Sequence, residues 1–245
     1  CAATATSRAT ARAASTTSRR RSGSRSSTRC VACVAAKRAC LMKWSAEIGA
    51  DALFSMSDTL SEYMGRALGI QEDTEFIQGA GEAAMGSVEG LEYTTHTAVS
   101  GAGSSWSDLT LANLVTTSGT LADKYIPGAS WIMSRAAWSQ IVLRVVSAAG
   151  GNTIDSLGVG TTGAQLLGYP VNFSDQAPTS TGTSQETMWF GNFSDAAVFG
   201  ARSGIEIATS EHVNFAEDQI AIRATSRYDI QVHDGSAYVS LDTTS

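Results

Sequence analysis

The sequence predicts an α+β fold, and three observations lead to that prediction. The chain has 245 residues, of which 43% are hydrophobic, enough for one large domain or two small ones. Its first half carries apolar residues at helical spacing, whereas its second half carries short apolar runs set off by Gly, Asp, Ser and Pro. Helices and antiparallel-looking strands are therefore segregated along the chain, as in the α+β class.

A long amphipathic helix is predicted from about residue 46 to residue 68. Apolar residues recur at every fourth position, which places them on one face of a helix about 34 Å long. They are Ile48, Ala52, Met56, Leu60, Met64 and Leu68. Gly69 is expected to end this helix, and residues 72–91 are expected to form a turn-rich bridge.

A second helix is predicted in the middle of the chain. Residues 92–107 are expected to be a loop or an edge strand. The helix should begin at a cap formed by Ser107 or Asp108, and Pro127 with Gly128 should stop it.

A short buried strand, Trp131–Met133, is predicted to lead into a third helix. Ser134 is placed to cap that helix, and Gly150-Gly151 should end it. The remaining strands are predicted at 166–173, 188–193, 196–199, 205–207, 220–222, 230–232 and 238–241.

Charge divides the chain into a basic head and an acidic body. Residues 1–46 hold ten basic side chains and no acidic one, which leaves seven basic and 23 acidic side chains for residues 47–245. Residues 1–43 consist mostly of Ala, Ser, Thr and Arg, so no packed face is expected there. Three interpretations remain open: a basic arm that binds nucleic acid, a disordered tail, and an out-of-frame read of GC-rich DNA.

All four cysteines lie in the head: Cys1, Cys30, Cys33 and Cys40. The Cys30-x-x-Cys33 pair suggests zinc or redox chemistry, but structural zinc needs four ligands and no histidine precedes His96. Unpaired thiols are the favoured interpretation. The body has no cysteine, so its fold should not depend on disulfides.

No apolar run approaches the roughly 20 residues needed to cross a bilayer. The arginine-rich start lacks the apolar centre of a signal peptide. Because the chain begins at Cys1 and not at a methionine, we expect a fragment, a processed product or an incomplete read.

The sequence offers weak signals for chemistry. Gly158-Val-Gly160-Thr-Thr-Gly163 matches a dinucleotide-binding pattern by letters, but a poor strand precedes it and Pro170 follows too soon for a helix. We therefore expect no cofactor, no metal site and no catalytic residue.

Two further sets of residues keep alternatives open. The histidines His96, His212 and His233 are scattered, so a dispersed Ser-His-Asp hydrolase site is the weaker alternative to surface or structural histidines. Arg223 and Arg227 are candidates for ion pairs or interface contacts, or are ordinary solvated residues.

Five stretches, in this order, carry a resemblance to a known family. They are Trp44-Ser45-Ala46-Glu47, Gln71 to Gly81, Tyr125 to Met133, Leu166 to Asp175, and a closing block from Phe190 to Arg227. Together they resemble the major capsid protein family of tailed double-stranded DNA bacteriophages, whose fold is shared with encapsulins, and the resemblance covers roughly residues 44–245.

The resemblance implies a phage major-capsid fold with a long spine helix. Residues 44–100 and 201–245 would form a peripheral, β-rich domain, and residues 101–200 an axial α/β lobe. In the family an N-terminal arm and a β-hairpin loop precede the spine helix and clasp neighbouring subunits. Residues 1–43 resemble neither, so those parts are expected to be missing or scrambled. Asn192 also replaces the usual acid of the closing block.

The resemblance also implies a structural role without catalysis. The subunit would form pentamers and hexamers of an icosahedral head in the virion, assembled in the host cytoplasm. Its partners would be itself, with a scaffold, a portal and a head-maturation protease, and no membrane. Packaged DNA should bind weakly to an acidic body. An encapsulin-like nanocompartment shell is the nearest alternative function.

Overall fold

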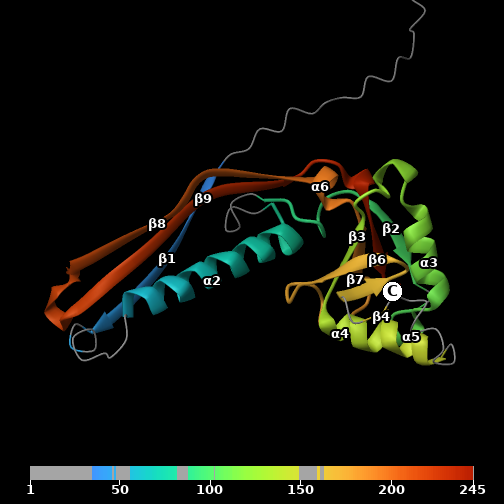
Figure 1. Cartoon of the computed structure of the whole chain (residues 1–245), viewed down its shortest axis with the longest axis horizontal. Coiled ribbons are helices and arrows are strands. Elements are labelled where there is room, and N and C mark those ends of the chain that lie inside the picture. The colour runs from blue at the N-terminus through green and yellow to red at the C-terminus, as the bar shows by residue number, and fades with distance from the viewer. Residues whose placement is uncertain are drawn as a thin grey trace, which may run out of the picture. The chain divides into compact units, whose positions relative to one another are not determined.

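The computed structural model describes residues 35–45, 47, 56–81, 88–101, 103–148, 159–160 and 163–244. Within the unit Val31–Ser245, the described residues form two β-sheets with helices packed on them, which confirms the α+β class (Figure 1). The helices are α2 (Met56–Gln78), α3 (Leu111–Thr120), α4 (Arg135–Ala137), a π-helical turn (Trp138–Val142), α5 (Leu143–Ala148) and α6 (Phe193–Ala196). Short 3₁₀ turns lie at Trp106–Asp108, Asp123–Tyr125, Phe215–Glu217 and Gly235–Ala237.

The first sheet has three antiparallel strands in the order β1-β9-β8, namely β1 (Ala36–Ser45), β9 (Gln219–Val232) and β8 (Ala197–Asn214). Helix α2 runs along one face of this sheet (Figure 1). Met64 and Leu68 of α2 are buried against Ile222 and Ala224 of β9. The predicted apolar stripe of the long helix is thus covered by a sheet, as such a stripe requires.

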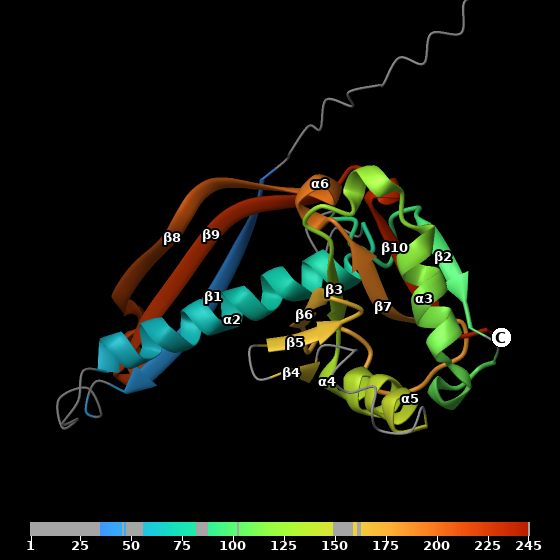
Figure 2. The same ribbon diagram turned by 45° about the vertical axis from the view of Figure 1, so that its right-hand side comes forward.

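The second sheet has seven strands in the order β2-β10-β7-β3-β6-β5-β4. They are β2 (Thr97–Ser100), β10 (Tyr238–Asp242), β7 (Glu186–Gly191), β3 (Ser130–Met133), β6 (Tyr169–Phe173), β5 (Gly163–Leu166) and β4 (Val159–Gly160). Figure 2 shows β10 between β2 and β7. The largest core cluster lies around this sheet, with Trp106, Trp131, Trp189 and Phe190 fully buried.

A row of aromatic rings connects α2 to the seven-stranded sheet. Phe76 near the end of α2 meets Phe193 of α6 edge to face, with ring centroids 6.5 Å apart. Phe193 in turn lies 6.3 Å from the ring of Tyr238 on β10. These contacts place the end of the long helix beside the core of the second sheet.

The prediction that Gly69 ends the long helix is wrong, because α2 continues to Gln78. A methyl group on Gly69 would meet no atom within 4 Å, so this glycine lies on an open helix face. Residues 72–78 are therefore helical and not a bridge. The apolar pattern does not predict these last turns, because Glu75, a buried acid, occupies a position of the apolar stripe. The predicted start of the helix at residues 46 and 48–55 lies outside the described residues.

The prediction of an unstructured head is wrong for residues 36–43. They belong to β1, which pairs with β9 along its whole length, from Ala36↔Tyr228 to Ser45↔Gln219. Cys40, Met42 and Trp44 alternate along β1 and pack on the α2 cluster. The predominance of Ala, Ser, Thr and Arg in residues 1–43 hid this strand, whose pairing partner β9 lies far away in the sequence. Residues 1–34 lie outside the described residues.

The second helix is shorter than predicted. Ser105 caps the turn Trp106–Asp108, and α3 itself begins after the N-cap Thr110 and ends at Thr120. The backbone is extended at Leu109 and at Leu121, and both side chains are buried. Packing of these two leucines in the core thus interrupts the helical periodicity.

The third helix and the strands around it follow the prediction more closely. Ser134 caps the helix as expected, since its hydroxyl accepts a hydrogen bond from the amide of Ala137 at 3.1 Å. The predicted end at Gly150-Gly151 lies outside the described residues. β3 and the edge strand β2 are confirmed.

The predicted strand at 166–173 is a hairpin of β5 and β6. Leu167 and Gly168 both have positive φ, 54° and 84°, and form the tight turn between the two strands. The predicted strand at 188–193 ends at Gly191, because Phe193 begins α6. The runs at 196–199 and 205–207 belong to one strand, β8, which is 18 residues long.

A buried ion pair joins β1, α2 and β9. The guanidinium of Arg38 donates to both carboxylate oxygens of Glu75, at 3.0 and 2.6 Å, and to the backbone carbonyl of Tyr228 at 3.0 Å. Arg38 is 8% exposed and Glu75 is 1% exposed. Burial alone would lower the pKa of Arg38, but the hydrogen bonds and charge of Glu75 raise it, so Arg38 stays charged.

We predict that Glu75→Gln lowers the free energy of unfolding by about 3–5 kcal/mol, because the buried guanidinium of Arg38 loses the carboxylate charge that contacts it directly. Replacing both partners, as in Arg38→Met with Glu75→Leu, should cost much less. Equilibrium denaturant unfolding measures both changes. Glu62→Gln, on an exposed position of α2, is the matched control. Equal losses in the single and double variants would contradict the role of the pair.

Candidate assembly surfaces

The structure places His96, one of the predicted site residues, beside an ionisable group of a neighbouring strand. Its Nε2 lies 3.3 Å from Oε1 of Glu186 on β7, and its Nδ1 lies 2.6 Å from the carbonyl oxygen of Thr94. The imidazole stacks on the ring of Tyr238 at 4.8 Å. The contacts with Glu186 on β7 and Tyr238 on β10 hold the segment before β2 against the edge of the seven-stranded sheet.

The pKa values of His96 and of two nearby carboxyl groups are shifted from their ordinary values. Burial opposes a charged ring on His96, but the nearby carboxylate of Glu186 and the Thr94 carbonyl outweigh it and raise the pKa of His96. Burial and the charge of Glu186 raise the pKa of Glu92 and of Asp242. All three shifts favour the protonated forms, so this cluster stabilises the fold most at acidic pH.

The arrangement around His96 does not assemble a Ser-His-Asp site in the described part of the chain. Both ring nitrogens face a carboxylate, a carbonyl or the Tyr238 hydroxyl, and none is hydrogen-bonded to a serine there. The hydroxyl of Ser240 instead donates to Asp242 at 2.6 Å. His96 therefore has the contacts of a structural histidine.

The other predicted site residues do not come together. His212 is exposed on β8, and His233 follows β9. Gly160 pairs with Gly163 in a β4–β5 hairpin, so Gly163 begins a strand where a dinucleotide site needs a helix. Cys40 is a free thiol on β1. Cys1, Cys30 and Cys33 lie outside the described residues.

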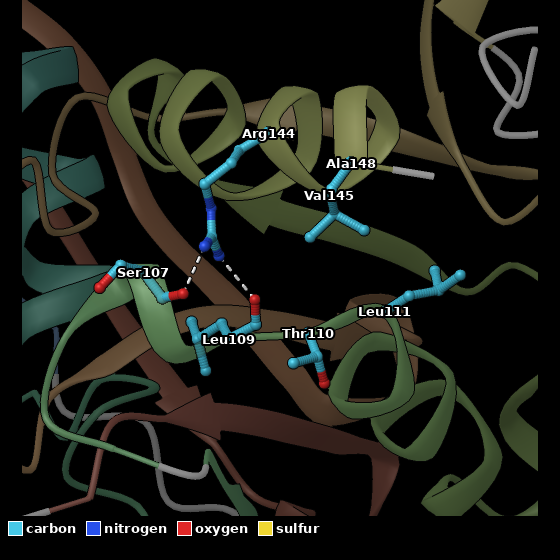
Figure 3. Close-up of a pocket in the computed structure, with 7 residues that line it drawn as sticks. All are labelled: Ser107, Leu109, Thr110, Leu111, Arg144, Val145 and Ala148. Carbon is cyan, nitrogen blue, oxygen red and sulfur yellow. Dashed lines mark hydrogen bonds between the residues drawn. The ribbon is translucent and has the colours of Figure 1, made fainter. Parts of the chain in front are cut away.

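Two hollows in the described structure are lined by side chains that make structural contacts. One pocket of about 290 Å³ lies between α5 and the start of α3, and its walls are mainly apolar: Ser107, Leu109, Thr110, Leu111, Arg144, Val145 and Ala148 (Figure 3). The Arg144 guanidinium donates to the carbonyls of Trp106, Ser107 and Leu109. Its charge thereby holds the end of a 3₁₀ turn in place.

A second hollow, of about 310 Å³, lies between α2 and β8. Phe76, Phe193 and Phe199 contribute aromatic walls, and Glu72 with Asp73 lie at its edge. Burial, together with the charges of Asp73 and Glu75, raises the pKa of Glu72. This hollow carries no nucleophile or metal-ligand cluster.

The described chain exposes many large apolar side chains, a feature typical of surfaces that other proteins cover. On β8 they are Val198, Phe199, Ile205, Ile207 and Val213, with Leu41 on β1 and Tyr63 and Ile70 on α2. Arg223 and Arg227, singled out in the sequence, are exposed on β9 between the other two strands. The candidate functional region is therefore the surface of the three-stranded sheet.

Two negative findings hold for the described residues. No group of three or more His, Cys, Asp or Glu side chains there is arranged to hold a metal ion. None of the helices described combines the length and the apolar composition needed to span a membrane.

The fold resembles that of several solved shell proteins. The capsid of an empty GTA particle superposes with a TM-score of 0.67 at 19% identity, covering 91% of this chain and 81% of that chain. The structure from Gordonia phage Cozz gives a TM-score of 0.64 at 16% identity, covering 87% and 71%. The SrpI encapsulin from Synechococcus elongatus gives 0.60 at 12% identity, covering 85% and 74%. The fold is thus the one that phage capsid and encapsulin subunits share.

The match of the sequence to a family model identifies one family among these shell proteins. The phage capsid family matches residues 3–242, which is nearly the whole chain, so the chain belongs to that family. Its role is that of a structural subunit of a capsid shell, and its place is the virion. No curated protein sequence matches the chain.

We predict that the His96 cluster makes the subunit less stable as pH rises. A raised histidine pKa contributes stability that is fully present below about 6.5, the ordinary value, and is lost as pH rises through the folded-state pKa. The thermal midpoint should therefore fall from weakly acidic to weakly alkaline pH, and less so in His96→Gln. Calorimetry across this range tests it. An unchanged decline in His96→Gln would contradict the assignment.

Proposed function

We propose that this chain is the major subunit of a tailed-phage head, forming pentamers and hexamers that close into an icosahedral shell around double-stranded DNA. The family match over residues 3–242 carries the proposal. The capsid structures that share the fold support it. A shell protein needs large surfaces for repeated contacts between identical subunits, and exposed apolar side chains on β8 and α2 provide such surfaces.

Each of the two sheets would form one lobe of the subunit. We assign residues 44–100 and 201–245 to the peripheral lobe with the spine helix α2, and residues 101–200 to the axial lobe. Strand pairing supports three changes to these bounds. β2 pairs with β10, and β10 pairs with β7, so Thr97–Ser100 and Tyr238–Asp242 go with the axial lobe. Residues 36–43 go with the peripheral lobe because β1 pairs with β9.

The proposed partners follow from the same assignment. A scaffold, a portal and a head-maturation protease would act on the shell, which would assemble in the host cytoplasm. The chain has 23 acidic and 17 basic side chains, so its contact with packaged DNA should be weak and non-specific.

We further propose that the subunit has no enzymatic activity of its own. The strongest candidate for a general base, His96, is held by Glu186 and the Thr94 carbonyl and stacks on Tyr238. These contacts suit a residue that fixes an edge strand. A hydrolase would need a nucleophile beside it.

An encapsulin-like compartment is the second candidate function. The SrpI encapsulin shares the fold with a TM-score of 0.60, which is close to the values for the phage capsids. The two functions differ in what the shell encloses, which is a genome in one case and a protein in the other.

Sedimentation velocity of the purified full chain tests the shell function. We expect species of five or six subunits, or closed shells, at micromolar concentration. Mass spectrometry of particles recovered from cells then separates the alternatives, because an encapsulin would retain a defined protein cargo. A stable monomer at every concentration would contradict both functions.

A further inference from the structure

The three-stranded sheet has one covered face and one exposed face. Cys40 and Met42 of β1 and Ile222 of β9 point toward α2. Because side chains alternate along a strand, the odd-numbered residues of β1 and β9 point to the opposite face. On that face every described odd residue of β1 from 37 to 43 is exposed.

The register of β1 and β9 gathers four bases on this exposed face. Lys37 lies directly opposite Arg227, and Leu41 lies directly opposite Arg223. Lys43 lies two residues beyond Leu41 on β1. Leu41 is 58% exposed between the two lysines. These five residues form what we call the basic face.

No described acidic side chain forms an ion pair with a base of the basic face. Between described residues the ion pairs are Arg38–Glu75 and His96–Glu186, so none of the four bases is paired there. On the same side of the sheet, Glu206 lies opposite Thr225, and Asp229 is buried. Like charges directly opposite on paired strands repel one another, as Lys37 and Arg227 do. An acidic partner surface would relieve that repulsion.

The turn between β8 and β9 has the complementary character. Glu217 and Asp218 in this turn and Glu211 near the end of β8 are exposed, and no lysine or arginine lies between residues 211 and 218. Val213 is 66% exposed among them. The amide of Asn214 donates to a carboxylate oxygen of Glu217 at 2.9 Å, which orders the turn. We call Glu211, Val213, Glu217 and Asp218 the acidic tip.

We propose that the acidic tip of one subunit docks on the basic face of a second copy, with Val213 against Leu41. The inference rests on the proposed function and deepens it by naming one contact between subunits. Charge is opposite on the two surfaces, and each has one exposed apolar residue among its charges. Such pairing of potentials selects the partner and its register.

The contact joins two copies and does not close within one. β8 and β9 stay paired from Ala197↔Val232 to Asn214↔Gln219, so the tip extends from the end of the same sheet that carries the face. A tip on such a hairpin cannot fold back over its own strands. The two patches differ, so the interface is heterologous, and repeating it builds a ring where the rotation closes.

Nucleic acid is the less favoured occupant of the basic face. The whole chain has a net charge of −6, which opposes approach to a phosphate backbone. Leu41 between the lysines also suits an apolar partner atom better than a phosphate. A second copy offers both the acids and the apolar residue.

Charge reversal of the full chain tests the contact. Lys37→Glu with Arg227→Glu should weaken association about tenfold in sedimentation velocity at low salt, and less at high salt. Glu217→Lys with Asp218→Lys should do the same. The fourfold variant, which carries all these changes, should recover association to within about threefold of wild type.

Arg66→Glu with Lys124→Glu is the matched control, since both residues are exposed and lie off the basic face. It should associate like wild type, and unfolding midpoints should show that every variant folds. If the wild type assembles and the Lys37→Glu/Arg227→Glu variant associates normally, the contact is overturned and the proposed function is not. If this variant lost DNA binding but associated normally, the contact would also be overturned and the basic face would be assigned to nucleic acid. A wild-type chain that never associates would contradict the proposed function and the contact with it.

Discussion

The buried pair of Arg38 and Glu75 is the constraint on which the three-stranded sheet depends. It fixes β1 to the long helix, and the Tyr228 carbonyl extends the same contact to β9. Because the side-chain period of a strand is two, a slip of one residue would turn Arg38 outward and Lys37 inward. A buried guanidinium that is held by the Glu75 carboxylate and the Tyr228 carbonyl therefore sets the register of β1, and through it decides which residues form the exposed face.

Sequence patterns were sufficient for the elements whose signals are local. The stripe at Leu60, Met64 and Leu68, the cap at Ser134 and the buried strand before it all rest on neighbouring residues, and the structure has each of them. The end of α2 could not be found in the same way. Its last turns bury Glu75, and an acid in a stripe position reads as solvent-facing unless its distant partner is known. That partner, Arg38, lies 37 residues earlier in a segment that composition alone made look disordered.

The candidate surfaces show the same limit. The family resemblance came from ordered motifs, and Arg223 with Arg227 stood out by residue type. Their grouping with Lys37 and Lys43 is a product of strand order, because β1 and β9 are far apart in sequence and adjacent in the sheet. The contact of His96 with Glu186 likewise crosses β10, which separates β2 from β7 in the sheet. Each grouping depends on non-local pairing, which no local periodicity encodes.

The account as a whole makes this chain a building unit whose chemistry lies in its surfaces. Its most direct test is electron cryomicroscopy of particles formed by the full chain. We expect closed shells in which the subunit, with α2 along the three-stranded sheet, repeats around five-fold and six-fold axes. Dispersed single subunits, or aggregates without rotational symmetry, would contradict the central claim.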